Sequence, residues 1–385
     1  MSWARDDAKL ARVRELMAEE ELEALVVRAP DNVLYLSNFW GMKGYDAVVF
    51  PRESEPILIA LEASADDVGR TAWTNDARFL KGYDDDDPRP PTARTLDLAR
   101  EASRDFDRVG LELSLGTQGS DRMVGEPTTF TRDWFDAFPN AADATPLLAR
   151  ARALKTAQEI ERVRLANDLC AEAMDYVRGH LRAGMKASEA AALWQGFVHG
   201  AGTGFRGKVE LALGFSLVWS GPGIRTFTAT TSGPVVEGEP TLFEIWVCVD
   251  GYWCDHTKNL VLGELSPRYV ELEEQLTEVY DAAVAHCRPG ASLPELDRLV
   301  REGIAAAGYP GQPTHPVCHG VGARAHEPPY AHQAGTGTIE ESMVLAIEPG
   351  IYWAGGGGLR LEDNFLITAD GAEKLSAFPD RIVRV

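Results

Sequence analysis

The stretch FEIWVCVDGYWCDHT at residues 243–257 decides the fold, because two apolar runs in it flank an Asp-Gly dipeptide at 250–251. Asp-Gly is a favoured two-residue turn between antiparallel strands, so the stretch predicts a β-hairpin. With that dipeptide as the loop, Glu244 faces Thr257, and Asp255 points to the same side of the sheet as Glu244. The backbones of the two acidic residues then lie roughly 7 Å apart. Carboxylates this close repel each other unless a proton or a cation joins them, so the hairpin is a candidate cation site.

Histidines gather in a second segment. HPVCHGVG at residues 315–322 and HEPP at 326–329 contain three of the eight histidines, namely His315, His319 and His326, within Gly/Pro-rich sequence. Imidazole is both a common metal ligand and a proton-transfer group. One histidine alone is more often structural, but three together in a loop favour a functional site.

Two glutamates stand at or inside apolar strands. The expected strand at 343–347 ends abruptly in EPG at 348–350, and Glu362 lies within the expected strand at 359–368. A carboxylate buried in a strand is costly unless it is paired or coordinated. Arg360, on the same strand face as Glu362, is one possible partner, and a metal ion is the other.

These four segments, in this order, resemble the pita-bread metallopeptidases of family M24, which include methionine aminopeptidase, aminopeptidase P and Xaa-Pro dipeptidase. The resemblance covers roughly residues 150–385. The N-terminal region, with NVLYLS at 32–37, is similar to the extra domain of the proline-directed branch and of creatinase. The resemblance implies an α+β fold, with a smaller creatinase-like α/β domain at 1–150 and a pita-bread catalytic domain at 151–385.

The resemblance also implies a centre of two divalent metal ions, with manganese expected first and cobalt, iron or zinc as other candidates. Its five ligands would be Glu244, Asp255, His319, Glu348 and Glu362, with Asp255 and Glu362 bridging the ions. Such a centre generates hydroxide from bound water and directs it at an amide carbonyl. Glu348 would relay the proton, His315 and His326 would contact substrate and intermediate, and Arg360 would orient Glu362.

The sequence departs from the family at two positions. Glu244 stands where the family has an aspartate, so its carboxylate extends one methylene further. The proline-directed peptidases carry a histidine seventeen residues before this ligand, whereas this chain has Phe227 there and no histidine nearby. Arg225 is a candidate replacement group for an anionic substrate, and a surface arginine is the plainer interpretation.

Three functions follow as hypotheses. The first is a metal-dependent hydrolase resembling Xaa-Pro dipeptidase or aminopeptidase. The second is a non-peptidase relative that acts on a small molecule, as creatinase, ectoine hydrolase and one dimethylsulfoniopropionate lyase do. The third is a non-catalytic protein that uses the pita-bread cleft to bind a partner.

Local patterns predict the individual elements. We expect a helix at 5–20, strands at 22–27, 47–50, 56–60 and 109–113, and a loop at 31–39. Capping residues predict helices that begin at Thr156, Ser188, Ser266 and Ser292. Besides those at 343–347 and 359–368, strands are expected at 241–249 and 252–262.

Composition excludes several classes of function. A net charge of −21 over 385 residues opposes binding to nucleic acid or to an anionic membrane. No run approaches eighteen apolar residues, and the first residues lack a signal-peptide core, so we expect a soluble, cytoplasmic protein. The five cysteines form no CxxC pair and are expected to be reduced and buried. The expected partner is a small molecule or short peptide, and the family resemblance implies a homodimer.

Overall fold

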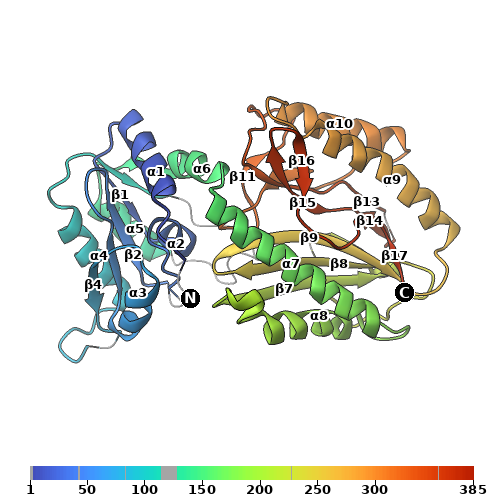
Figure 1. Ribbon diagram of the computed structural model, residues 1–385, viewed down its shortest axis with the longest axis horizontal. Helices are drawn as coiled ribbons and strands as arrows, with labels where there is room; N and C mark the ends of the chain where they lie inside the picture. Colours follow the sequence, from blue (N-terminus) through green and yellow to red (C-terminus); the bar gives the residue numbers. More distant parts are fainter. Residues whose placement is uncertain (1–2, 42–43, 83, 114–127, 227, 354) are drawn as a thin grey trace. The chain divides into compact units, whose positions relative to one another are not determined.

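The computed structural model describes residues 3–41, 44–82, 84–113, 128–226, 228–353 and 355–385 (Figure 1). These residues form two compact units, Met1–Arg152 and Ala153–Val385. The expected boundary at 150/151 lies two residues from this division. None of the described helices is both long and apolar enough to span a bilayer.

The N-terminal unit is an α/β domain around one six-stranded sheet of order β4-β3-β2-β1-β5-β6. Its strands are β1 (Ala24–Val27), β2 (Ala47–Pro51), β3 (Ile57–Leu61), β4 (Asp76–Leu80), β5 (Val109–Leu111) and β6 (Ala142–Asp143). Its helices are α1 (Asp7–Glu19), α2 (Pro30–Ser37), α3 (Ala65–Thr71), α4 (Pro91–Ser103), α5 (Thr128–Ala137) and α6 (Thr145–Ala153), where α6 ends one residue into the second unit. Alternate strand residues enter two separate apolar clusters, so both faces of the sheet are buried.

The loop expected at 31–39 is wrong, because this segment is the helix α2. Pro30 occupies the first helical turn, where its missing N–H costs nothing, and Asn38 closes the helix in the left-handed conformation. All helical residues except Pro30 are buried, seven of eight. Tertiary packing therefore stabilises the helix, although the polar residues of this segment favour a turn.

Four helices of the C-terminal unit form its outer layers: α7 (Ala157–His180), α8 (Ala187–Gly202), α9 (Pro267–His286) and α10 (Leu293–Ala306). The predicted starts at Thr156, Ser266 and Ser292 are the observed N-caps, and Thr156 forms a capping box with Glu159. The start predicted at Ser188 is two residues late, since Lys186 is the N-cap of α8.

The strands of this unit form two larger sheets and one small ribbon. The first sheet has the order β17-β9-β8-β7, the second β11-β10-β12-β15-β16, and β13 pairs with β14. Their bounds are β7 (Ala212–Ser220), β8 (Thr241–Val249), β9 (Tyr252–Val261), β10 (Cys318–Gly320), β11 (Glu327–Tyr330), β12 (Val344–Ile347), β13 (Gly350–Tyr352), β14 (Gly358–Arg360), β15 (Asp363–Thr368), β16 (Gly371–Lys374) and β17 (Val383–Arg384). Helices α7 and α8 pack on the first sheet and α9 on the second, which leaves the other sheet faces to line the interior (Figure 1).

The hairpin predicted from FEIWVCVDGYWCDHT is confirmed with its register. In the β8–β9 pair, Glu244 lies opposite Thr257 and Trp246 opposite Asp255. Both turn residues, Asp250 and Gly251, have positive φ angles, as a tight two-residue turn requires.

The single strand expected at 359–368 is wrong, because this segment forms two strands, β14 and β15. The chain pairs with β13 up to Arg360, then leaves that ribbon and pairs with β12 from Asp363 onward. Between the two strands, Glu362 forms an isolated bridge with Thr257 of β9. This change of partner joins the two sheets at Glu362 and turns its side chain toward the hairpin.

Candidate metal centre

The five predicted ligands come from both large sheets and converge in the interior of the C-terminal unit. Glu244 and Asp255 extend from β8 and β9, His319 from β10, Glu348 follows β12, and Glu362 lies between β14 and β15. All five are buried, with at most 7% of any one exposed. The sequence placed these residues at one site, and the structure brings them together.

Three overlapping groups of donor atoms lie within this cluster. In each group one atom per residue lies within 4.8 Å of the others; the groups are Glu244/Asp255/Glu362, His319/Glu348/Glu362 and Asp255/His319/His326. Glu362, Asp255 and His319 each belong to two groups. Of these three, Glu362 and Asp255 are carboxylates, and a carboxylate has two oxygens with which to bind metal.

Unpartnered donor atoms show that the cluster fits a cation. Both carboxylate oxygens of Asp255 and Nε2 of His319 are buried without a hydrogen-bond partner among the described residues. His319 Nδ1 lies 3.0 Å from the carbonyl of Gly320, to which it donates, so its Nε2 faces the site. That Nε2 lies 3.6 Å from Asp255 Oδ2 and 3.4 Å from Glu348 Oε1. A buried metal ion would satisfy all of these atoms together.

The electrostatics of the cluster agree with this fit. Burial, together with the negative charges of Glu362 and Glu348, raises the pKa of Asp255 well above its ordinary value. Burial lowers the pKa of His319, but the nearby carboxylate of Glu348 outweighs it and raises the pKa overall. Both shifts favour added positive charge at the cluster, as a bound cation would supply.

His315 and His326 lie beside the ligands, and their pKa values shift in opposite directions, upward for His315 and downward for His326. His315 Nδ1 lies 3.2 Å from Glu348 Oε2. Burial acts to raise the pKa of Glu348, but the charge of His315 and hydrogen bonds from both histidines hold it at about 2. Burial and the neighbouring charge of His319 lower the pKa of His326 to about 3, so this ring is neutral. Its Nε2 faces Asp255 Oδ2 at 3.3 Å.

Arg360 contacts more of the centre than the sequence predicted. Its Nε donates to Thr257 Oγ1 at 2.5 Å and lies 3.4 Å from Glu362 Oε2, while Thr257 donates to that same oxygen at 2.6 Å. Its Nη2 forms an ion pair with Glu244. Arg360 therefore holds two of the candidate ligands, Glu244 and Glu362, rather than Glu362 alone.

Three residues of the site were missed in the sequence. Thr257 links Arg360 to Glu362, Tyr352 contacts both Arg360 and His315 through its hydroxyl, and Asn364 exchanges two hydrogen bonds with the backbone of Asp255. Only Thr257 had a signal, because the hairpin register places it on the face of Asp255.

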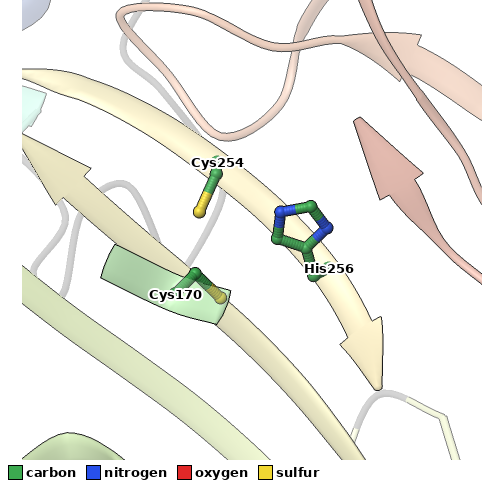
Figure 2. A group of neighbouring side chains, drawn as sticks. All are labelled: Cys170, Cys254 and His256. Atoms are coloured by element: carbon green, nitrogen blue, oxygen red, sulfur yellow. The ribbon is translucent and has the colours of Figure 1, made fainter. Parts of the chain in front are cut away.

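On the opposite face of β9, Cys254 and His256 lie beside Cys170 of α7 and form a second cluster of side chains (Figure 2). His256 Nε2 lies 2.8 Å from Asn167 Oδ1, and its Nδ1 lies 3.2 Å from Asp363 Oδ1. Burial raises the pKa of the Cys254 thiol well above its ordinary value, which makes the thiol unreactive. All five cysteines are free and buried, as expected.

The expected absence of the family's histidine near Phe227 lies partly outside the described residues. Phe227 is not among the described residues. Arg225, two positions earlier, is exposed. It lines a cavity that Tyr352 also borders.

Comparisons with known proteins identify both units. Residues 161–369 match the model for metallopeptidase family M24, and residues 9–154 match the creatinase/prolidase N-terminal domain. The Xaa-Pro dipeptidase of Lactobacillus helveticus is 25% identical over 377 residues, which cover 94% of this chain and 95% of that protein. The Xaa-Pro dipeptidase of Pyrococcus furiosus is 35% identical over 142 residues, covering 37% and 41% of the two chains.

The solved structures agree on the fold. The prolidase from Pyrococcus horikoshii OT3 superimposes with a TM-score of 0.81 at 22% identity, over 98% of this chain and all of that one. This match confirms the expected α+β fold with a pita-bread catalytic domain. The chain therefore belongs to metallopeptidase family M24 and is a hydrolase of that family.

Proposed function

We propose that this chain is a metal-dependent dipeptidase that hydrolyses Xaa-Pro dipeptides. The observation that carries the proposal is the convergence of one histidine and four carboxylates on a single buried site with unpartnered donor atoms. The Lactobacillus Xaa-Pro dipeptidase, which aligns over nearly the whole chain, supports the choice of substrate class.

Five side chains would hold two divalent ions: Glu244, Asp255, His319, Glu348 and Glu362. Asp255 and Glu362 are the two carboxylates that belong to two donor groups, which supports a bridging role for them. The bound ions would supply Lewis acidity, which lowers the pKa of water and polarises the substrate carbonyl. A set of four carboxylates and one imidazole favours Mn(II), with Co(II), Fe(II) or Zn(II) as other occupants.

The chain's own residues would then move protons and orient the substrate. Glu348 is ionised and lies against His315, so it accepts the proton of the attacking water and passes it to the leaving amine. His326 is neutral and nearly enclosed, which suits a ring that hydrogen-bonds the substrate carbonyl region. Arg360 keeps Glu244 and Glu362 in place.

A substrate panel tests this proposal. Manganese-loaded protein is incubated with Xaa-Pro dipeptides, with longer X-Pro peptides and with dipeptides that lack proline. We expect the Xaa-Pro dipeptides to be cleaved fastest. Glu348→Gln should lower kcat about 100- to 10,000-fold, the range for a lost proton-transfer group. Glu341→Gln, at an exposed glutamate outside the donor groups, is the matched control. No turnover of any peptide by protein with confirmed bound metal would refute the proposal.

The alternatives are less well supported. A non-peptidase enzyme for a small molecule is not favoured, because the relatives aligned over nearly the full chain are named as Xaa-Pro dipeptidases or peptidases. A non-catalytic binding role does not fit a family of hydrolases whose ligand set is present here.

Location and assembly complete the proposal. Five free, buried cysteines suit a reducing compartment and support a cytoplasmic location. The homodimer implied by the family resemblance is retained as part of the proposal. Light scattering of the purified protein tests it, with a mass twice the chain's 42.0 kDa expected.

A further inference from the structure

Three side chains of metal-ligating type lie on the face of β9 that points away from the candidate metal centre. Cys254 and His256 share this face because they are two residues apart on the strand, and Cys170 lies beside them on α7 (Figure 2). One ligand atom from each residue lies within 4.8 Å of the others. Two thiols and one imidazole are ligands of the kind that structural zinc sites use.

The cluster is enclosed between the strand and the helix. Cys170 is 1% exposed, and Cys254, His256 and Asn167 are 0% exposed. Both strand side chains face α7, since Cys254 Sγ lies 3.5 Å from the carbonyl oxygen of Ala166 and His256 Nε2 lies 2.8 Å from Asn167 Oδ1. The Nε2 atom therefore faces the helix that carries Cys170.

The other nitrogen of His256 has the contact that a metal-bound histidine usually has. Its Nδ1 lies 3.2 Å from Asp363 Oδ1. A carboxylate at one ring nitrogen fixes the proton there and leaves the lone pair of the other nitrogen for a metal. Lys258 Nζ donates to the same oxygen at 2.5 Å, so this carboxylate has a cationic partner without a charged imidazole.

Asn167 is the candidate fourth ligand. Its Nδ2 donates to the carbonyl of Val163 at 2.8 Å, which turns its Oδ1 toward His256. A neutral imidazole has one N–H, so it can donate to the oxygen of Asp363 or to that of Asn167 but not to both. A cation bound at Nε2 would satisfy the oxygen of Asn167 as well.

Charge and chemical type of the ligands select the ion. Two thiolates balance the charge of one divalent ion, and the imidazole and the amide are neutral, so the occupied site has no net charge to bury. Sulfur ligands suit Zn(II), whereas the carboxylates on the other face of β9 suit Mn(II). The two faces of this strand therefore offer ligands for different metals.

We propose that Cys170, Cys254 and His256, together with Asn167, form a structural zinc site separate from the candidate metal centre. Binding forms two Zn–S bonds and releases the two thiol protons to water, so it requires no oxidant or reductant. The ion links α7 to β9, the strand on which Asp255 lies between Cys254 and His256. This role in holding the strand does not depend on the proposed dipeptidase function.

Cobalt(II) tests the site, because it occupies zinc sites and its bonds to thiolates absorb strongly in the near ultraviolet. The chain is produced with cobalt in the medium, so that the enclosed site fills during folding. Wild type should show the thiolate-to-cobalt band, and Cys170→Ala should lose this band and one bound cobalt per chain. Cys287→Ala is the matched control and should retain both, since Cys287 is equally buried and belongs to no donor group of the described residues.

The band is specific for this site, because the five candidate ligands of the metal centre include no cysteine. Cys254→Ala removes the thiol on the strand and keeps the test decisive if Cys170→Ala does not fold. Absence of the band in wild type, or a full band in either of these two variants, would overturn the zinc site.

Zinc and thiol counts complete the test. Elemental analysis of protein produced with zinc should give one zinc more per chain in wild type than in Cys170→Ala. Protein denatured with a chelator and without reductant should show all five thiols. Two missing thiols would indicate a disulfide between Cys170 and Cys254 and would refute zinc binding there. None of these measurements involves peptide cleavage, so a failure of the dipeptidase proposal leaves their outcome unchanged.

Discussion

Glu244 stands at a candidate ligand position where the family resemblance leads us to expect an aspartate. Its longer side chain reaches Arg360 and forms an ion pair there while one of its oxygens stays near Asp255 and Glu362. Metal–ligand distances tolerate changes of only about 0.2 Å, so a carboxylate shared with a guanidinium is a poorer ligand than an aspartate at the same position. The two ions should therefore bind with unequal affinities.

Shortening this side chain tests that expectation. Glu244→Asp should tighten the weaker manganese site about tenfold, a change typical of altered ligand surroundings. Isothermal titration of metal-free protein with manganese measures both affinities. Glu264→Asp, at an exposed glutamate, is the control. Equal affinities in the wild type, or no gain in Glu244→Asp, would show that Glu244 does not weaken the site.

Asp46 in the N-terminal unit gives a pH-dependent prediction away from the metal centre. Burial raises its pKa from 3.8 to about 6, against backbone hydrogen bonds that lower it. Because the folded pKa is the higher one, the folded state holds this proton more tightly. Stability is therefore lost as pH rises from about 4 through 6, by up to about 3 kcal/mol.

Replacing this carboxyl by an amide removes that loss. Asp46→Asn should raise the free energy of unfolding by about 1 to 3 kcal/mol at pH 8 and by much less at pH 4. Urea unfolding at the two pH values measures the difference, with the exposed Asp105→Asn as control. An equal effect at both pH values would rule out titration of Asp46 as the cause.

At the scale of elements, local signals predicted the hairpin and the helix starts because each depends on residues close in sequence. The Asp-Gly turn sets the register of β8 and β9, and Thr156 caps α7 through Glu159. The helix α2 and the break between β14 and β15 were missed, since packing and a change of strand partner decide them.

At the site too, the sequence predicted local features but not the contacts between distant segments. Motifs predicted the five candidate ligands, which the structure brings together. The link from Arg360 through Thr257 to Glu362 joins residues more than a hundred positions apart. No local pattern encodes such a contact, so only the folded chain reveals it.

The capping box of α7 gives a prediction for this scale. Thr156→Ala should destabilise the protein by about 1 kcal/mol, because the backbone N–H of Glu159 loses its acceptor. Ser188→Ala is a matched control, since Ser188 lies inside α8 rather than at its cap. Chemical unfolding measures both free energies, and equal losses would show that the cap of α7 contributes nothing specific.

For the molecule as a whole, family membership and the buried donor cluster indicate the same class of reaction. The cluster of four carboxylates and one histidine fits metal-assisted hydrolysis.

Metal titration of Xaa-Pro dipeptide hydrolysis tests this account most directly. Protein stripped of metal by a chelator is titrated with manganese while dipeptide cleavage and bound metal per chain are measured together. The account predicts no activity in the stripped protein and a rise that saturates as two ions bind to each chain. Full activity without metal, or two bound ions without any cleavage, would contradict it.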